Sequence, residues 1–178
     1  AFEAAGLEVV PVPLDEGGLD VAALPPGLAA VYCTPAHQYP LGALLPADRR
    51  VALVERARAE RFLVIEDDYD GELRFDVAPL PLLAALGPDV VAHLGTASKV
   101  LTPTLGAGWL VAPAPVRTAV LDRRELTGQR PSRAGQRVLA ALAAHGDLAR
   151  HLRRLRRELA DRRALTVAAV EAAGLRVR

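Results

Sequence analysis

The chain has little cysteine, few aromatic residues and almost no net charge. Only one of its 178 residues, Cys33, is a cysteine, so an intrachain disulfide and a cysteine-based metal site are excluded. The 22 basic and 21 acidic side chains give a net charge of +1, which provides no broad electrostatic attraction to DNA or to a membrane. Because 51% of the residues are hydrophobic and 24% are charged, a disordered tail is also excluded.

Long hydrophobic runs are missing as well. No stretch of about 18 uncharged apolar residues occurs, and residues 1–14 lack the basic start and apolar core of a secretory signal. Together with the single cysteine, this composition predicts a cytoplasmic protein.

Lysine is nearly absent, since 21 of the 22 basic residues are arginine and the remaining one is Lys99. An amine can lose its proton and attack a carbonyl group to form a Schiff base, whereas a guanidinium keeps its proton. Lys99 is therefore a candidate catalytic residue. Composition alone is equally consistent with one leftover surface lysine.

Short apolar runs alternate with a helical pattern, which predicts an α/β fold. Residues 47–60 place apolar side chains at helical spacing between two such runs, and strand, helix, strand is the order that gives a parallel sheet. Continuous apolar runs are typical of strands buried on both faces. The predicted strands are Leu7–Pro13, Ala29–Cys33, Phe62–Ile65, Val90–Leu94 and Gly108–Val111.

The last third of the chain is predicted to be helical. Residues 134–145 form a short amphipathic segment, and Asp147 can cap a long helix that runs to about Ala173. One face of the long helix is rich in arginine. That face favours a solvated or interface surface over a phosphate-binding one, because Glu158 and Asp161 interrupt it.

Acidic side chains follow one predicted strand directly, where the sequence after Ile65 reads EDDYD (66–70). This position lies at the carboxyl edge of the predicted sheet, where open α/β folds bind their ligands. The cluster allows three interpretations: a magnesium site, a carboxylate that pairs with a cationic ring nitrogen, or a polar loop that ends the strand.

A second predicted strand end carries Lys99. The strand at 90–94 leads into Gly95, whose lack of a side chain lets backbone or a ligand approach closely. Thr96 and Ser98 follow, and their hydroxyls are suited to hydrogen-bonding a phosphate. The spaced glycines of a Walker phosphate loop are missing. A Schiff-base lysine, a carboxylate for a ring nitrogen and a phosphate cup are the groups that pyridoxal 5'-phosphate requires.

Four segments, in order, resemble the signatures of MocR-type, GntR-linked transcriptional regulators. They read TPAHQYPLG (34–42), EDDYD (66–70), GTASKVLTP (95–103) and HLRRLR (151–156). The resemblance implies the fold type I aminotransferase architecture, a three-layer α/β domain with a mostly parallel sheet, followed by a long helix leading to a small domain. Residues 1–146 would then be part of the large cofactor domain, and 147–178 the connecting helix and the start of the small domain. The winged-helix domain and the first half of the cofactor domain would precede this chain.

The same resemblance implies roles for individual residues. Lys99 would be the catalytic residue that forms the Schiff base with the cofactor. Asp67 would pair with the pyridine nitrogen, and Tyr69 would hydrogen-bond to the phenolic oxygen of the ring. The further cofactor-binding residues that it implies lie near the phosphate, at Thr96 and Ser98, or on a loop that approaches the cofactor, at His37 and Gln38.

One position departs from the family pattern. The family has an arginine seven residues after the lysine, where it binds the cofactor phosphate, and here that position is Gly106. Losing a charge-assisted phosphate contact costs about 1.5–3 kcal/mol, which corresponds to a loss of affinity of roughly tenfold to over a hundredfold. The arginine that would hold a substrate carboxylate in related proteins lies beyond Arg178.

Three functions remain open on these residues. The leading interpretation is the effector-sensing part of a MocR-type regulator, in which an amino acid or amine exchanges with Lys99 and another domain binds DNA. The second is a pyridoxal-phosphate-dependent aminotransferase acting on an amino acid or amine, and the third is a degenerate dimerisation module without cofactor. A homodimer is implied by the resemblance, because fold type I proteins build their sites at a dimer interface.

Overall fold

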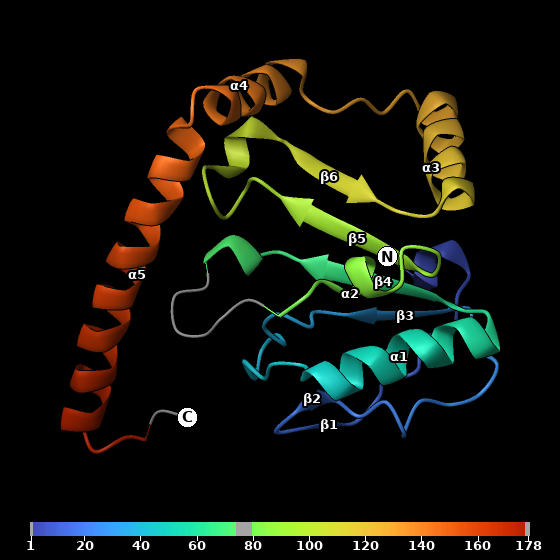
Figure 1. Ribbon diagram of the computed structural model, residues 1–178, viewed down its shortest axis with the longest axis horizontal. Helices are drawn as coiled ribbons and strands as arrows, with labels where there is room; N and C mark the ends of the chain where they lie inside the picture. Colours follow the sequence, from blue (N-terminus) through green and yellow to red (C-terminus); the bar gives the residue numbers. More distant parts are fainter. Residues whose placement is uncertain (1, 74–79, 177–178) are drawn as a thin grey trace. The chain divides into compact units, whose positions relative to one another are not determined.

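The structure is a computed structural model that describes residues 2–73 and 80–176 (Figure 1). The chain divides into two compact units, each assembled from separate stretches of sequence. The first unit contains residues 1–67, 80–93 and 111–114, and the second contains residues 68–79, 94–110 and 115–178. The predicted site residues are therefore shared between two units.

One sheet contains four strands in the spatial order Ala30–Cys33 (β3), Leu63–Asp68 (β4), Val91–Thr96 (β5) and Gly108–Val111 (β6). Strands β3 and β4 are parallel, with Tyr32 opposite Ile65. Figure 1 shows the arrows of β3, β4 and β5 pointing the same way and that of β6 pointing the opposite way, so the sheet is mixed and mostly parallel. The predicted α/β class is confirmed.

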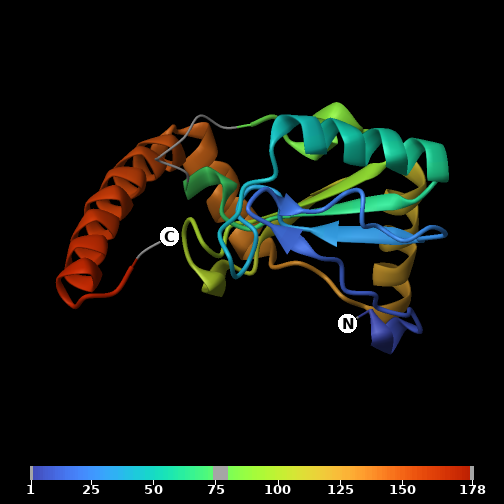
Figure 2. The same cartoon turned by 90° about the horizontal axis from the view of Figure 1, so that it is seen from below.

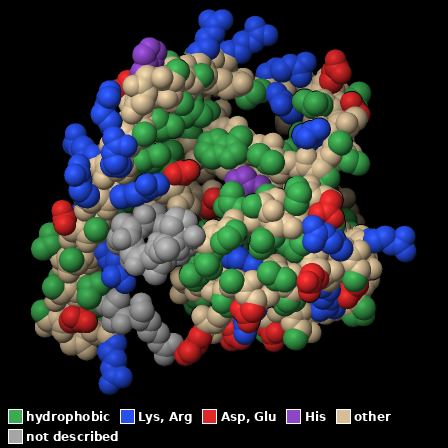
Figure 3. All heavy atoms as spheres, viewed as in Figure 1, with side chains coloured by type: hydrophobic (Ala, Val, Ile, Leu, Met, Phe, Trp, Pro, Cys, Tyr) green, Lys and Arg blue, Asp and Glu red, His purple; other side chains and the backbone are tan. Residues whose placement is uncertain are grey.

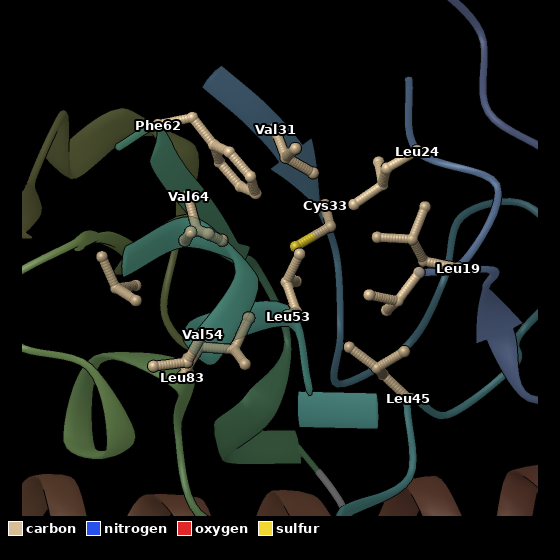
Figure 4. Close-up of a cluster of buried hydrophobic side chains, with 13 residues drawn as sticks. Leu19, Leu24, Val31, Cys33, Leu45, Leu53, Val54, Phe62, Val64 and Leu83 are labelled. Atoms are coloured by element: carbon tan, nitrogen blue, oxygen red, sulfur yellow. The ribbon is translucent and has the colours of Figure 1, made fainter. Parts of the chain in front are cut away.

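Helix α1 (Ala47–Glu60) connects β3 to β4 and covers one face of these strands in the first unit (Figure 2). Its residues Leu53 and Val54 are buried in the core. Figure 4 shows Leu53 beside Cys33 and Val54 beside Leu83. The bounds of α1 are those predicted from the spacing of its apolar residues.

The remaining elements of the first unit are short. They are a 3-10 turn at Glu3–Ala5 (η1), a hairpin of Leu14–Asp15 (β1) and Gly18–Leu19 (β2), and the one-turn helix Leu83–Leu86 (α2). The strand predicted at Leu7–Pro13 is wrong, because these residues form no strand. Proline has no N–H to donate to a strand ladder, and the segment contains Pro11 and Pro13.

The prediction that the strands are buried on both faces is wrong for β3 and β6. In β3, Val31 and Cys33 are buried while Tyr32 between them is exposed, which is the alternation of a strand packed on one face. In β6, Trp109 and Val111 are exposed. The apolar runs therefore predicted the positions of these strands correctly, but they predicted more burial of the side chains than the structure shows.

The second unit is mostly helical. It contains α4 (Arg133–Ala144), α5 (Asp147–Ala172), nearly all of α3 (Ala114–Thr127), and the 3-10 turns η2 (Gly71–Leu73) and η3 (Pro103–Leu105). The two predicted helices at 134–145 and 147–173 agree with α4 and α5 to within one residue at each end. The N-cap of α5 is Gly146, one residue earlier than predicted. Across the described ranges, no helix combines the length and the apolar content that crossing a membrane requires.

Arginine side chains gather along α5, as Figure 3 shows. Several of them have acidic or backbone partners within the second unit. Arg154 lies 2.7 Å from Glu158, and Arg156 lies 3.1 Å from the Glu72 carboxylate and 2.6 Å from the Glu72 carbonyl oxygen. These pairs engage part of the positive charge of α5, and its role as a solvated or interface surface stays a prediction.

Candidate functional site

Asp67 lies near the end of β4 in the first unit, with its side chain partly exposed. Side chains alternate along a strand, so Asp67 points to the face opposite to that of its buried neighbour Glu66. The phenol of Tyr32, on the neighbouring strand β3, donates a hydrogen bond to Oδ2 of Asp67. Among the described residues, Oδ1 of Asp67 has no hydrogen-bond donor, so this oxygen can accept one from a ligand.

Glu66 points into the core and is 1% exposed. One carboxylate oxygen accepts the Leu83 N–H at 2.8 Å, and the other accepts the Ala84 N–H at 3.2 Å and lies 3.1 Å from Nδ1 of His93. These contacts join β4, β5 and the start of α2 within the first unit. They hold the end of β4 in place directly beside Asp67.

The electrostatics of Glu66 follow from these contacts. Burial by itself raises the pKa of the Glu66 carboxyl, but hydrogen bonds from His93, Leu83 and Ala84 outweigh it and leave the pKa below its usual value. The opposite occurs at Cys33, where burial, with the nearby Glu66 charge, raises the pKa of the thiol to about 12. Since a thiolate is the reactive form of cysteine, Cys33 is inert at neutral pH.

The loop after β3 carries His37 and Gln38, and both side chains are half-buried in the first unit. The Gln38 amide is used within the loop: its Nε2 donates to the Tyr39 carbonyl, and its Oε1 accepts the Leu41 N–H at 3.1 Å. Two backbone bonds add to this, from Gln38 N–H to the Ala43 carbonyl and from Gly42 N–H to the Gln38 carbonyl. Gln38 thus shapes the loop, and its role toward a cofactor stays a prediction.

The side chain of Arg50, on α1, holds that loop in place. Its side chain is 2% exposed, and its guanidinium donates to three backbone carbonyls, those of Leu45 at 2.8 Å, Pro35 at 2.7 Å and Pro81 at 2.9 Å. Pro35 and Leu45 bracket the loop, so one buried arginine fixes both of its ends. Sequence reasoning missed Arg50 because nothing in an arginine-rich chain distinguishes a buried arginine from an exposed one.

Lys99 lies in the second unit, in the turn that follows β5, and its side chain is exposed. Thr96 is the last residue of β5, and its hydroxyl oxygen accepts the Ser98 N–H at 3.1 Å. Buried Ala97 donates its N–H to the Ala107 carbonyl at 3.0 Å, which ties the turn to the segment before β6. A further contact comes from α5, where Nε2 of His151 lies 2.7 Å from the Val100 carbonyl oxygen. The amine therefore projects from a turn whose backbone is held on both sides.

Gly95 and Trp109 meet within the same unit. A Cβ at Gly95 would overlap the indole of Trp109, so the absence of a side chain at Gly95 allows the ring to lie on β5. The sequence predicted that backbone or a ligand approaches Gly95 closely, whereas the neighbour in the structure is the side chain of Trp109.

Gly106, at the position of the family's phosphate-binding arginine, ends η3 with a φ of 55° and a ψ of 39°. This left-handed conformation suits glycine. A Cβ built there would meet only Ser132, at an ordinary 3.7 Å, so a Cβ fits at this position at the cost of backbone strain.

The predicted site residues divide between the two units. Asp67, His37 and Gln38 belong to the first, and Tyr69, Thr96, Ser98 and Lys99 belong to the second. The structure brings Thr96 together with Ser98, and it adds Tyr32 to Asp67. That Asp67 and Lys99 bracket one ligand stays a prediction. In the part of the chain that the structure describes, no three His, Cys, Asp or Glu side chains gather as metal ligands.

A groove of about 520 Å³ lies beside β3 in the first unit and is lined by residues from both faces of this strand. Its walls are largely apolar, and the residues from the site region that line it include Tyr32, Thr34, Gln38 and Ile65. Much of the remaining lining comes from residues 7–12, the mostly apolar and largely exposed segment before β1.

Comparison with known proteins shows the family of the chain. The family model described as aminotransferase class I and II matches residues 1–178. The HTH-type pyridoxine biosynthesis transcriptional regulator PdxR of Corynebacterium glutamicum is 48% identical over 160 residues, covering 90% of this chain and 35% of that protein. The probable rhizopine catabolism regulatory protein MocR of Rhizobium meliloti is 34% identical over 166 residues, covering 92% of this chain and 34% of that protein.

A solved structure supports the same fold. The crystal structure of Pyrococcus horikoshii kynurenine aminotransferase in complex with PMP superposes with a TM-score of 0.84 at 31% identity, covering 90% of this chain and 42% of that one. The chain thus spans about a third of the length of its curated relatives and less than half of that enzyme.

Proposed function

Because the chain belongs to the aminotransferase class I and II family, we propose that it is the pyridoxal-phosphate-binding, effector-sensing part of a MocR-type transcriptional regulator. The single observation that carries this proposal is Lys99, the one lysine of the chain, exposed in a well-anchored turn at the end of β5. A primary amine at this place in an aminotransferase fold can react with an aldehyde.

The available hydrogen-bond donors and acceptors fit the chemistry of the cofactor. Oδ1 of Asp67 is available to a ring N–H, and the Thr96 hydroxyl, whose oxygen already accepts the Ser98 N–H, keeps its own proton for a phosphate oxygen. Tyr69 and His37 would complete the set. When bound, pyridoxal phosphate supplies an aldehyde that condenses with amines and a ring that withdraws electrons.

Within this proposal each residue has a defined task. Lys99 would hold the cofactor through its amine, and the aldehyde of the cofactor would also be open to an incoming amino compound. Asp67 would hold the ring nitrogen, and Thr96 and Ser98 would donate to the phosphate. Gly106 leaves that phosphate without the guanidinium partner present in related proteins, which predicts weaker cofactor binding.

The proposal extends to the intact protein. Its effector would be an amino acid or amine, it would act as a homodimer in the cytoplasm, and DNA would be bound by a domain other than residues 1–178. The boundary between the large domain and the connecting helix would lie between residues 146 and 147, where α5 begins. For sensing, the effector must bind two conformations of the protein with different affinity.

The decisive experiment uses the intact protein as its gene encodes it. The protein is incubated with pyridoxal phosphate, reduced with borohydride and digested, and the peptides are analysed by mass spectrometry. We expect a reduced adduct on the peptide containing Lys99 and none in Lys99→Arg, which keeps the charge and removes the amine. Failure to label Lys99 in the wild type overturns the proposal.

The same protein preparation distinguishes the proposal from two alternatives, an aminotransferase and a regulator whose signal is the cofactor itself. An aminotransferase would transfer nitrogen from an amino donor to a keto acid with repeated turnover, whereas a regulator would bind a specific operator. The PdxR relative is a regulator of pyridoxine biosynthesis by name, which favours a second candidate in which the cofactor itself is the signal. In that case pyridoxal phosphate alone, without any amino compound, would change operator affinity.

A further inference from the structure

We propose that Tyr32 is a positioning residue for the cofactor site: its phenol orients the carboxylate of Asp67 toward the ring nitrogen. The inference rests on the proposed function, because Asp67 has this task only if the cofactor binds here. It adds a residue that the motif resemblance does not include, since Tyr32 precedes the 34–42 signature.

The strand register places the two side chains together. Tyr32 is opposite Ile65, and Asp67 lies two residues further along β4. Residues two apart on a strand share a face, so Tyr32, Ile65 and Asp67 lie on the same face of the sheet, away from α1. The phenol of Tyr32 reaches past Ile65 along the strand direction and donates a hydrogen bond to Oδ2 of Asp67.

The hydrogen bond leaves Asp67 with one available oxygen. A carboxylate without a partner rotates about its Cβ–Cγ bond and presents either oxygen to a ligand. With Oδ2 engaged by Tyr32, Oδ1 becomes the oxygen presented to a cationic ring N–H. On the opposite face Glu66 fixes the β4 backbone through Leu83, Ala84 and His93, so that both the main chain and the carboxylate plane are held.

The exposure of Tyr32 separates this role from a structural one. Its side chain is 49% exposed, with the ring of Phe2 packed edge-on at a centroid distance of 5.8 Å. Hydrogen bonds of exposed groups contribute little to folding because water replaces them. Removing the hydroxyl should therefore change cofactor binding more than protein stability.

The test is Tyr32→Phe in the intact protein, with Tyr39→Phe as the matched control. Tyr39 is a 75%-exposed tyrosine of the same unit, and removing its hydroxyl also leaves the ring in place. Pyridoxal phosphate is titrated by absorbance, and unfolding is measured without cofactor. We expect Tyr32→Phe to weaken cofactor binding about three- to tenfold and to shift the pH profile of the bound cofactor's absorbance. Tyr39→Phe should change neither, and both variants should unfold like the wild type.

A double-mutant cycle shows whether Tyr32 acts through Asp67. In an Asp67→Ala background, where Lys99 still anchors the cofactor, Tyr32→Phe should have no further effect on affinity. An equal effect in both backgrounds, or wild-type affinity in Tyr32→Phe, overturns the inference while leaving the proposed function intact. A wild-type protein that never labels at Lys99 overturns both.

Discussion

Gly106 stands where the resemblance to MocR-type regulators implies a phosphate-binding arginine. Its left-handed backbone at φ 55° is favourable for glycine and unfavourable for arginine, yet only Ser132 lies near the missing Cβ. A Cβ there would thus be strained by the backbone but would clash with no neighbour. The departure from the family pattern is reversible by one substitution.

Gly106→Arg should have two opposite effects. Backbone strain should lower the free energy of unfolding by about 1–2 kcal/mol, while a guanidinium beside the phosphate should raise pyridoxal phosphate affinity by about tenfold or more. Urea unfolding and absorbance titration measure the two effects separately. Gly128→Arg is the control, because Gly128 also has a positive φ, 66°, and open surroundings. A gain in affinity in the control as well would show that added charge, rather than position, is responsible.

Glu66 shows how one buried carboxylate supports a functional neighbour. We expect Glu66→Gln to lower the free energy of unfolding at neutral pH by about 1–3 kcal/mol, because it replaces a charged acceptor of the Leu83 and Ala84 amides with a neutral one. The control is Glu125→Gln, an exposed glutamate on α3, which should change stability little.

The pH dependence of that loss has a definite sign. The folded pKa of Glu66 is lowered, so its stabilising contribution is fully present above the unfolded pKa, about 4.3, and decreases as pH falls through the folded value. The difference between wild type and Glu66→Gln should therefore shrink as unfolding is measured at decreasing pH below about 5. A difference that grows on acidification would contradict the account of this group.

At the scale of elements, the loop after β3 depends on a helix that packs below it. Arg50 of α1 donates to carbonyls at both ends of the loop and to Pro81, just before α2. The loop that carries His37 and Gln38 is thus placed by a side chain outside its own sequence motif. Its conformation depends on the packing of α1 as much as on its own turns.

Arg50→Lys should destabilise the protein by about 2 kcal/mol or more, since one ammonium cannot reach three separated carbonyls and leaves buried acceptors unpaired. Amide hydrogen exchange should increase between residues 35 and 46 more than elsewhere in the first unit. Arg163→Lys, at an exposed position on α5, should leave both measurements unchanged. Uniform acceleration across the protein would indicate global destabilisation without specific release of the loop.

At the scale of the whole molecule, cofactor binding and stability are linked. A ligand that binds only the folded state raises the unfolding free energy by about 2.7 kcal/mol at a hundred times its dissociation constant. Pyridoxal phosphate should therefore raise the thermal midpoint of the intact protein. Pyridoxine 5'-phosphate, which keeps the ring and the phosphate but has an alcohol in place of the aldehyde, should have a smaller effect, and Lys99→Arg should remove the difference between the two compounds. Equal stabilisation by both compounds in the wild type would mean that the amine of Lys99 is not used.

The sequence by itself determined the local elements and the family. Apolar spacing predicted α1 to the residue and β6 to the residue, because both patterns are set by neighbours along the chain. The order of the 34–42, 66–70, 95–103 and 151–156 motifs identified the aminotransferase fold, which the family match confirms. The strand predicted at Leu7–Pro13 is absent. The prediction followed the apolar side chains of this segment, but its two prolines lack the N–H groups that strand pairing requires.

Only the tertiary structure decided which polar groups meet. Tyr32 and Asp67 are 35 residues apart, Glu66 and His93 are 27 apart, and Arg50 and Pro81 are 31 apart. No periodicity encodes such pairs, because each arises from the register of neighbouring strands or from the packing of a helix on them. The burial of Arg50 has the same origin: charge patterning gives every arginine the same expected surface position, and packing encloses Arg50 while the other arginines of the described residues stay exposed or half-buried.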